Sequence, residues 1–146
     1  MNVADWARSY IGIPFKSGGR DRSGVDCYGL VRLVYLEQAG AQLPSLDDLY
    51  KDALKAAETE PLFVANVPLL LGERHENPKF LDVAVILERG HPTHLGVYVG
   101  GGFILHATRR LGVILQRKTD PDLSRRIEGY YAVKIADADS SVFGKV

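Results

Sequence analysis

The chain has 146 residues, enough for one domain with one hydrophobic core. Lys plus Arg and Asp plus Glu both number 18, and this balanced charge argues against a nucleic-acid-binding protein. No run of about 18 apolar residues is present, which excludes a helical membrane span, and the first residues lack the basic and apolar regions of a secretory signal. The single cysteine, Cys27, excludes an internal disulfide and leaves an inert thiol, a metal ligand or a nucleophile.

The N-terminal half has the spacing of helices. Apolar side chains recur at intervals of three and four residues, and glycine, proline or a capping residue marks the ends of each stretch. The predicted helices cover residues 3–11, 26–40 and 45–57. A polar, glycine-rich stretch over 16–24 predicts a loop, and the proline-interrupted stretch 58–79 fits no single pattern.

The C-terminal half changes to the pattern of strands. We expect five strands, over residues 81–87, 93–99, 102–108, 112–117 and 130–135. Helices followed by strands with short connections are typical of the α+β class, in which helices cover one side of an antiparallel sheet. The sequence therefore predicts a single α+β domain over 1–146.

Cys27 follows Asp26 at the first turn of the second predicted helix. The positive end of the helix dipole and the unpaired N–H groups there favour a thiolate, which is the nucleophilic form of cysteine. The glycine-rich loop before it would leave the sulfur approachable. An inert thiol packed under the helix is the alternative, and position alone slightly favours it, so a catalytic cysteine requires a base elsewhere.

His94 and His106 are the candidate bases, because both fall inside predicted strands, whereas His75 and His91 have the surroundings of solvated residues. Residue 100, the first of three consecutive glycines, lies midway between them. A hairpin with an odd-numbered loop centred there, for example over 99–101, pairs His94 with His106 on one face of the sheet. A two-residue loop would place His106 on the opposite face.

With both histidines on one face, one can deprotonate Cys27 while the other orients it. The competing hypothesis is a metal site made of Cys27, His94 and His106, with or without His91. Zinc sites commonly contain close ligand pairs such as Cys-x-x-Cys, which this chain lacks. We therefore expect no metal and no cofactor.

Two blocks of sequence resemble the NlpC/P60 family of cysteine peptidases. The family pattern is G-x-P-Y-x-x-G-G followed by D-C-S-G-L-V, and later H-x-G-I-Y-x-G followed by F-I-H-A. The matching stretches here are Gly12–Gly19, Gly24–Val31, Thr93–Gly100 and Phe103–Ala107. They occur in the family's order with similar spacing, and together they cover nearly the whole chain.

The resemblance implies a papain-like α+β fold, with N-terminal helices packed on an antiparallel sheet of about five strands. It implies that Cys27 is the nucleophile, His94 the general base and His106 the residue that orients the base. It also implies a substrate, the peptide stems of bacterial peptidoglycan, cleaved between D-glutamate and a diamino acid.

The chain departs from the family pattern at Phe15, where tyrosine is usual, and at Tyr28, where serine is usual. Both changes would alter the wall of the substrate pocket, and Phe15 cannot donate a hydrogen bond to an oxyanion. We expect Phe15, Gly19, Asp26 and Tyr28 to contact or shape the substrate cleft. Tyr28 and its neighbours over 24–32 resemble the phage-tail and prophage branch of the family more than its other members.

A phage-tail role would also suit the absent export signal. We therefore expect an enzyme made in the bacterial cytoplasm, carried on a virion tail with tail proteins as partners, and acting at the cell wall. Two rival hypotheses are a non-catalytic docking component of a phage tail and an acyltransferase that passes the acyl group to an amine or lipid.

Overall fold

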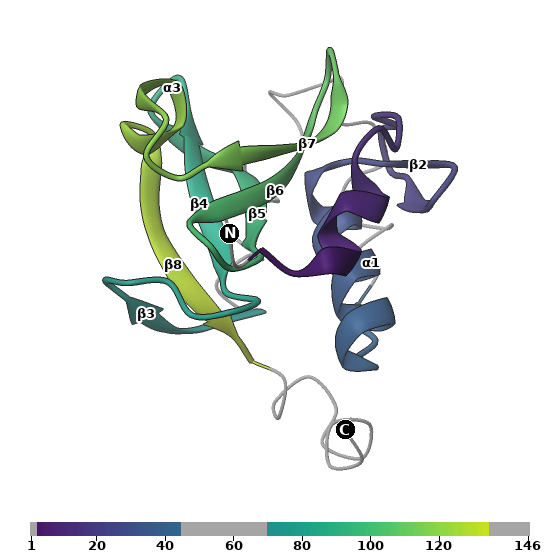
Figure 1. Ribbon diagram of the computed structural model, residues 1–146, viewed down its shortest axis with the longest axis horizontal. Helices are drawn as coiled ribbons and strands as arrows, with labels where there is room; N and C mark the ends of the chain where they lie inside the picture. Colours follow the sequence, from purple (N-terminus) through teal and green to yellow (C-terminus); the bar gives the residue numbers. More distant parts are fainter. Residues whose placement is uncertain (1–2, 45–69, 135–146) are drawn as a thin grey trace.

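A curved antiparallel sheet and the helix α1 make up most of the fold (Figure 1). The computed structural model describes residues 3–44 and 70–134. The sheet has six strands in the order β3-β8-β4-β5-β6-β7. Their bounds are β3 Leu71–His75, β4 Val83–Glu88, β5 His91–Tyr98, β6 Phe103–Thr108, β7 Gly112–Arg117 and β8 Ile127–Val133. The predicted α+β class is confirmed.

All five predicted strands are present, and β3 is the sixth. The prediction missed β3 because it lies in the proline-interrupted segment and shows no regular alternation of buried and exposed residues. Its pairing with β8, which begins at Ile127 rather than residue 130, defines it as a strand. The helix predicted over 45–57 lies outside the described residues.

Helix α1 (Cys27–Ala39) confirms the predicted second helix. Asp26 caps it, because its side chain accepts a hydrogen bond from the backbone N–H of Gly29. Gly40 ends it in the left-handed conformation, with φ of 64°. These two local signals place Cys27 in the first turn of the helix.

The first predicted helix is a 3-10 helix, η1 (Asp5–Tyr10). Ala7 and Tyr10, three residues apart, are both fully buried, which suits a helix with three residues per turn. The loop predicted over 16–24 contains a small two-stranded ladder, β1 (Arg20–Asp21) with β2 (Gly24–Val25). A further short helix, α3 (Pro121–Ser124), precedes β8.

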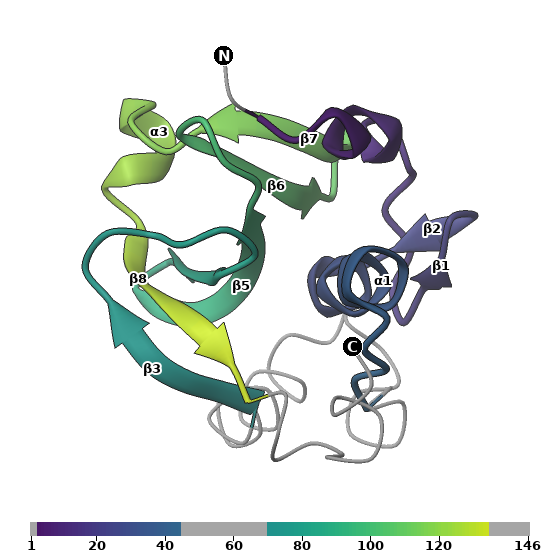
Figure 2. The ribbon, with the colours of Figure 1, turned by 60° about the horizontal axis from the view of Figure 1, so that its bottom comes forward.

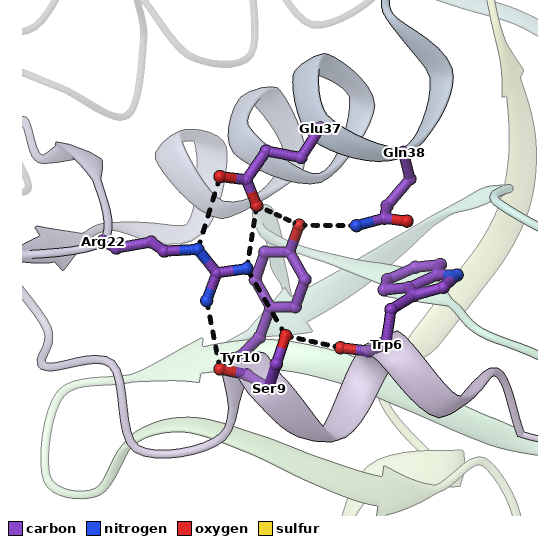
Figure 3. A network of polar contacts seen from close by, with 6 residues as sticks. All are labelled: Trp6, Ser9, Tyr10, Arg22, Glu37 and Gln38. Carbon is purple, nitrogen blue, oxygen red and sulfur yellow. Dashed lines mark hydrogen bonds and ion pairs between the residues drawn. The ribbon is translucent and has the colours of Figure 1, made fainter.

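A polar network ties η1 and the β1–β2 turn to α1 (Figure 3). Tyr10 donates a hydrogen bond to Glu37 at 2.5 Å, Gln38 donates to the Tyr10 hydroxyl at 3.2 Å, and the Arg22 guanidinium pairs with Glu37 at 2.9 Å. Burial, followed by the bond to Glu37, raises the pKa of Tyr10 to about 12, so its hydroxyl keeps the proton that it donates. The network therefore fixes the segment that leads into Cys27.

The two faces of the sheet differ in what covers them. Helix α1 contacts β5 and β6, and Figure 2 shows α1 nearly end-on beside the curved sheet. Leu95, Val97 and Val99 belong to the large core cluster that includes α1, as the alternation predicted. Tyr98 packs on the second, smaller cluster formed by Ala84, Ile86, Ile104, Leu123 and Tyr130.

The described residues contain no helix with the length and apolar character that a membrane span requires.

Candidate active site

The β5–β6 hairpin places His94 and His106 on one face of the sheet. Gly96 lies opposite His106, and the closing residues Val99 and Phe103 bracket a three-residue loop over 100–102. All three loop glycines have positive φ, of 88°, 62° and 84°. The odd loop length and the shared face are confirmed. The direct pairing of His94 with His106 is wrong, because the loop is centred one residue later, at Gly101.

The two imidazoles nevertheless meet, because Gly96 stands opposite His106. His94 Nε2 lies 2.9 Å from His106 Nδ1, and the ring planes are inclined by 72°. A Cβ atom on Gly96 would lie 2.7 Å from Ile104 Cγ2 and 3.2 Å from the Cβ of His106. Glycine at this position leaves the space through which the diagonal pair of rings makes contact.

Gln116 on β7 contacts the far side of His106, and the sequence analysis did not single it out. Its Oε1 lies 2.8 Å from His106 Nε2. Gln116 pairs with Ile104 in the register of β6 and β7, so it shares the face of His106. The signal was present in the alternation of 112–117, but using it required the register between the two strands.

Both histidines are uncharged at neutral pH. Burial, followed by the neighbouring His106, lowers the pKa of His94 to about 3, and Arg126 and Arg109 act in the same direction. Burial also lowers the pKa of His106, against an opposing effect of its hydrogen bond to Gln116. Neutral imidazole is the form of histidine that can accept a proton, and the low pKa makes His94 a weak base in this conformation.

The Cys27 sulfur lies against the backbone on either side of His94. Sγ is 3.9 Å from the carbonyl oxygen of Thr93, and the backbone N–H of Leu95 is close enough to lower the pKa of the thiol. Among the described residues, the hydrogen bond of the sulfur goes to the Thr93 carbonyl oxygen, and the His94 ring is hydrogen-bonded to His106. The structure therefore places the predicted nucleophile against the backbone that carries the predicted base.

The resting form of Cys27 is a thiol. Burial, followed by the charges of Asp26 and Glu88, raises its pKa to about 12, although the N–H groups of Leu95 and Tyr28 act in the opposite direction. This is the reverse of the thiolate expected from the helix N-terminus. The Asp26 carboxylate that caps α1 is itself a negative charge next to the sulfur, so nucleophilic attack requires a base.

Alkylation of Cys27 by iodoacetamide is expected to accelerate about tenfold per pH unit from pH 6 to 9.5, without a plateau. The sign follows from the raised pKa, because the reactive thiolate fraction keeps growing until the pH reaches about 12. Mass spectrometry of the intact protein measures the rate, since Cys27 is the only cysteine. A small-molecule thiol is the control and should level off near pH 9. A rate independent of pH above 6 would contradict a resting thiol.

Asp26 and Gly19 hold the backbone around Cys27. The buried Asp26 carboxylate accepts hydrogen bonds from the N–H groups of Gly29 and Gly18 and pairs with Arg20 at 2.9 Å. A Cβ on Gly19 would lie 2.2 Å from the carbonyl oxygen of Gly24. The predicted cap is confirmed, and both residues support the site from within, while contact with substrate stays a prediction.

Phe15 and Tyr28 have different surroundings. Phe15 is half-buried, bridges to Val25, and lies under the Arg109 guanidinium at 5.2 Å from its ring centre. Tyr28 is 1% exposed, and its hydroxyl donates to the carbonyl oxygen of Pro44 at 2.5 Å. Tyr28 is thus a buried core residue in this conformation, and it does not form the exposed pocket wall that we expected from the sequence.

The other two histidines lie apart from the pair. His91 is an exposed residue at the start of β5. His75, expected to be solvated, lies in β3, and its Nδ1 is 2.6 Å from the Asp82 carboxylate. Within residues 3–44 and 70–134, no group of three His, Cys, Asp or Glu side chains is arranged to hold a metal ion.

The comparisons with known proteins agree on one family. Residues 12–131 match the NlpC/P60 family. The murein DD-endopeptidase MepS/murein LD-carboxypeptidase of Escherichia coli K12 is 24% identical over 123 residues, covering 84% of this chain and 55% of that protein. Protein P54 of Enterococcus faecium is 30% identical over 101 residues, covering 69% of this chain and 16% of that protein. The chain spans about half the length, or less, of these curated relatives.

Solved structures show the same fold. The NlpC/p60 domain of the peptidoglycan hydrolase SagA is 25% identical, with a TM-score of 0.57 over 86% of this chain and 92% of that chain. An NLP/P60 family protein of Staphylococcus aureus, described as similar to a lipoprotein, is 22% identical, with a TM-score of 0.59 over 88% of this chain and 39% of that chain.

Proposed function

Since this chain belongs to the NlpC/P60 family, we propose that it is a cysteine peptidase that hydrolyses the stem peptides of bacterial peptidoglycan. The observation that carries the proposal is the placement of the Cys27 sulfur against the backbone that flanks His94, whose ring is bonded to His106. The names of its relatives, a murein endopeptidase and a peptidoglycan hydrolase, support the substrate class.

In the proposed first step, the Cys27 sulfur attacks the carbonyl carbon of the scissile bond while His94 Nδ1 takes the thiol proton. Nδ1 is the nitrogen available for this, because Nε2 is bonded to His106. The oxyanion then forms near the first turn of α1, where the backbone N–H of Cys27 is a candidate donor. Phe15 has no hydroxyl to assist it.

In the proposed second half, the His94 imidazolium gives its proton to the leaving amine, and the C–N bond breaks to leave a thioester on Cys27. Water then attacks the thioester while His94 accepts one of its protons. The C–S bond breaks, the proton returns to sulfur, and a free carboxylic acid leaves. His94 thereby carries one proton from sulfur to the leaving amine in the first half of the reaction and one proton from water to sulfur in the second half.

The proposed scissile bond is that between D-glutamate and the diamino acid. Digestion of purified peptidoglycan and of defined muropeptides, followed by mass spectrometry, tests it. The expected product is a stem shortened to its glutamate. Separation of cross-linked stems would instead indicate a DD-endopeptidase, the activity named for the Escherichia coli relative. A product joined to an added amine would indicate an acyltransferase, and no turnover would favour a docking module.

Association with a phage tail is a further proposal, supported by the similarity of the residues around Tyr28 to that branch of the family. Peptide mass spectrometry of purified virions from a lysogen that encodes the chain tests it. The chain should co-purify with the tail proteins, and its absence from tails that are otherwise complete would contradict the proposal.

A further inference from the structure

Three polar side chains from β5, β6 and β7 form a continuous hydrogen-bonded chain. His94 bonds to His106 at 2.9 Å, and His106 bonds to Gln116 at 2.8 Å. The carboxylate of Asp120, just before α3, lies close enough to Gln116 for the Gln116 side chain to lower its pKa. The first two members have roles in the proposed function, whereas Gln116 and Asp120 have none.

The Gln116 amide points its Oε1 toward His106, at 2.8 Å from His106 Nε2. The nearby Asp120 carboxylate favours this direction, because a carboxylate accepts hydrogen bonds and attracts the NH2 group to its own side. Asp120 is ionised at neutral pH, because the Gln116 side chain and the N–H of Asp122 lower its pKa. Its other role, as the cap of α3, holds it in place, with Oδ1 3.0 Å from the N–H of Asp122.

The amide direction then sets both imidazole tautomers. An oxygen facing His106 Nε2 requires that this nitrogen carry the proton, and a neutral imidazole carries only one. His106 Nδ1 is therefore an acceptor, so His94 Nε2 must carry the proton that joins the rings. The remaining nitrogen, His94 Nδ1, is left with a bare lone pair.

We propose that Gln116 is a positioning residue, which holds His106 and His94 in the tautomers that leave His94 Nδ1 unprotonated for the Cys27 thiol. The role rests on the proposed function. When Nδ1 takes the thiol proton, His94 becomes an imidazolium whose Nε2–H already donates to His106. No proton has to be rearranged within the pair, and the acceptor nitrogen of His106 stabilises the new charge.

The reverse arrangement would disable the base. A donor facing His106 Nε2 would place the proton on Nδ1 of His106, which would then donate to His94 Nε2. His94 would carry its proton on Nδ1, the nitrogen proposed to receive the proton from sulfur. A wrong histidine tautomer can lower kcat by about 10⁴-fold in a triad enzyme. Gln116 acts one residue further away, so its removal should cost less.

The first test is ¹⁵N NMR of the ring nitrogens in the unmodified protein at pH 7.5. We expect a bare Nδ1 and a protonated Nε2 on both His94 and His106. A protonated Nδ1 on either ring would overturn the proposal. This measurement needs no substrate, so it separates a failure of the tautomer assignment from a failure of the proposed peptidase activity.

The second test replaces Gln116 in two ways. Gln116→Leu should mix the tautomers of both rings and lower kcat by at least about tenfold, with KM within about twofold. Gln116→Glu retains an acceptor for His106 Nε2, so at pH 8 it should restore the tautomers and most of kcat. Gln38→Leu is the matched control, since Gln38 bonds to Tyr10 in the network that joins α1 to η1.

Three results would overturn the role of Gln116. The first is an unchanged kcat in Gln116→Leu. The second is a lower kcat with unchanged tautomers, which would indicate a merely structural effect. The third is a Gln116→Glu protein that is as impaired as Gln116→Leu.

Discussion

Replacing Cys27 with alanine is expected to abolish hydrolysis of peptidoglycan peptides, lowering kcat by about 10⁴-fold or more. Without the sulfur no thioester can form, and the histidine pair has no proton to accept from the enzyme. The side chain is half-buried and lies in a first helical turn, where alanine is well tolerated. We therefore expect the free energy of unfolding to change by about 1 kcal/mol or less. Product release from defined muropeptides measures the loss, and urea denaturation checks the fold.

The histidine pair extends the same experiment. His94→Ala should lower kcat by about 10²- to 10⁴-fold, because it removes the proposed base. His75→Ala is the matched control, since His75 bonds to Asp82 and lies on β3. Turnover by the Cys27→Ala protein within about tenfold of the unmodified protein would contradict the assignment of the nucleophile.

Asp26→Ala is expected to have the largest effect on stability, lowering the free energy of unfolding by about 3–5 kcal/mol. The carboxylate is 2% exposed, caps α1, and pairs with an Arg20 side chain that is 12% exposed. Its removal leaves the Arg20 charge buried without that carboxylate and takes away a helix cap. A loss of this size is a large part of the about 5–15 kcal/mol that stabilises a typical domain. Urea denaturation measures it.

Two further variants of Asp26 and its neighbourhood separate a structural role from a substrate role. Asp26→Asn keeps an oxygen for the Gly29 N–H, so it should retain part of the lost stability. Asp21→Ala is the control, because Asp21 is exposed and, within the described part of the chain, its hydrogen bonds go to Ser23 in the same turn; little change in stability is expected. If Asp26→Ala unfolds like the unmodified protein but has a raised KM, Asp26 acts on the substrate and the structural assignment fails.

The parts of the site that depend on neighbours in the chain were predictable. Asp26 and Gly40 mark the ends of α1, and they placed Cys27 in its first turn before any tertiary contact was known. The alternation of β5 separated His94 from Leu95, and three consecutive glycines indicated a hairpin that puts His106 on the face of His94. The family motifs added the expected roles of these residues.

The parts of the fold and the site that depend on residues distant in the chain were not predictable. The centre of the loop at Gly101 decided that Gly96, and not His94, lies opposite His106. The pairing with β8 made β3 a strand, although its own residues have no strand pattern. Tyr28, expected near the substrate, is buried, and its hydroxyl tolerates this burial because it donates a hydrogen bond to the carbonyl oxygen of Pro44.

The sequence by itself thus determined the helix that carries Cys27, the strands that carry His94 and His106, and the family. Periodicity and capping act within a few residues, so they can be read along the chain. Only the tertiary structure decided the protonation of the site and the part of Gln116 in it. Burial raises the pKa of the Cys27 thiol and lowers that of His94, and a register between two strands brings Gln116 to His106. Burial and register are set by residues far apart in the chain, so no local pattern contains them.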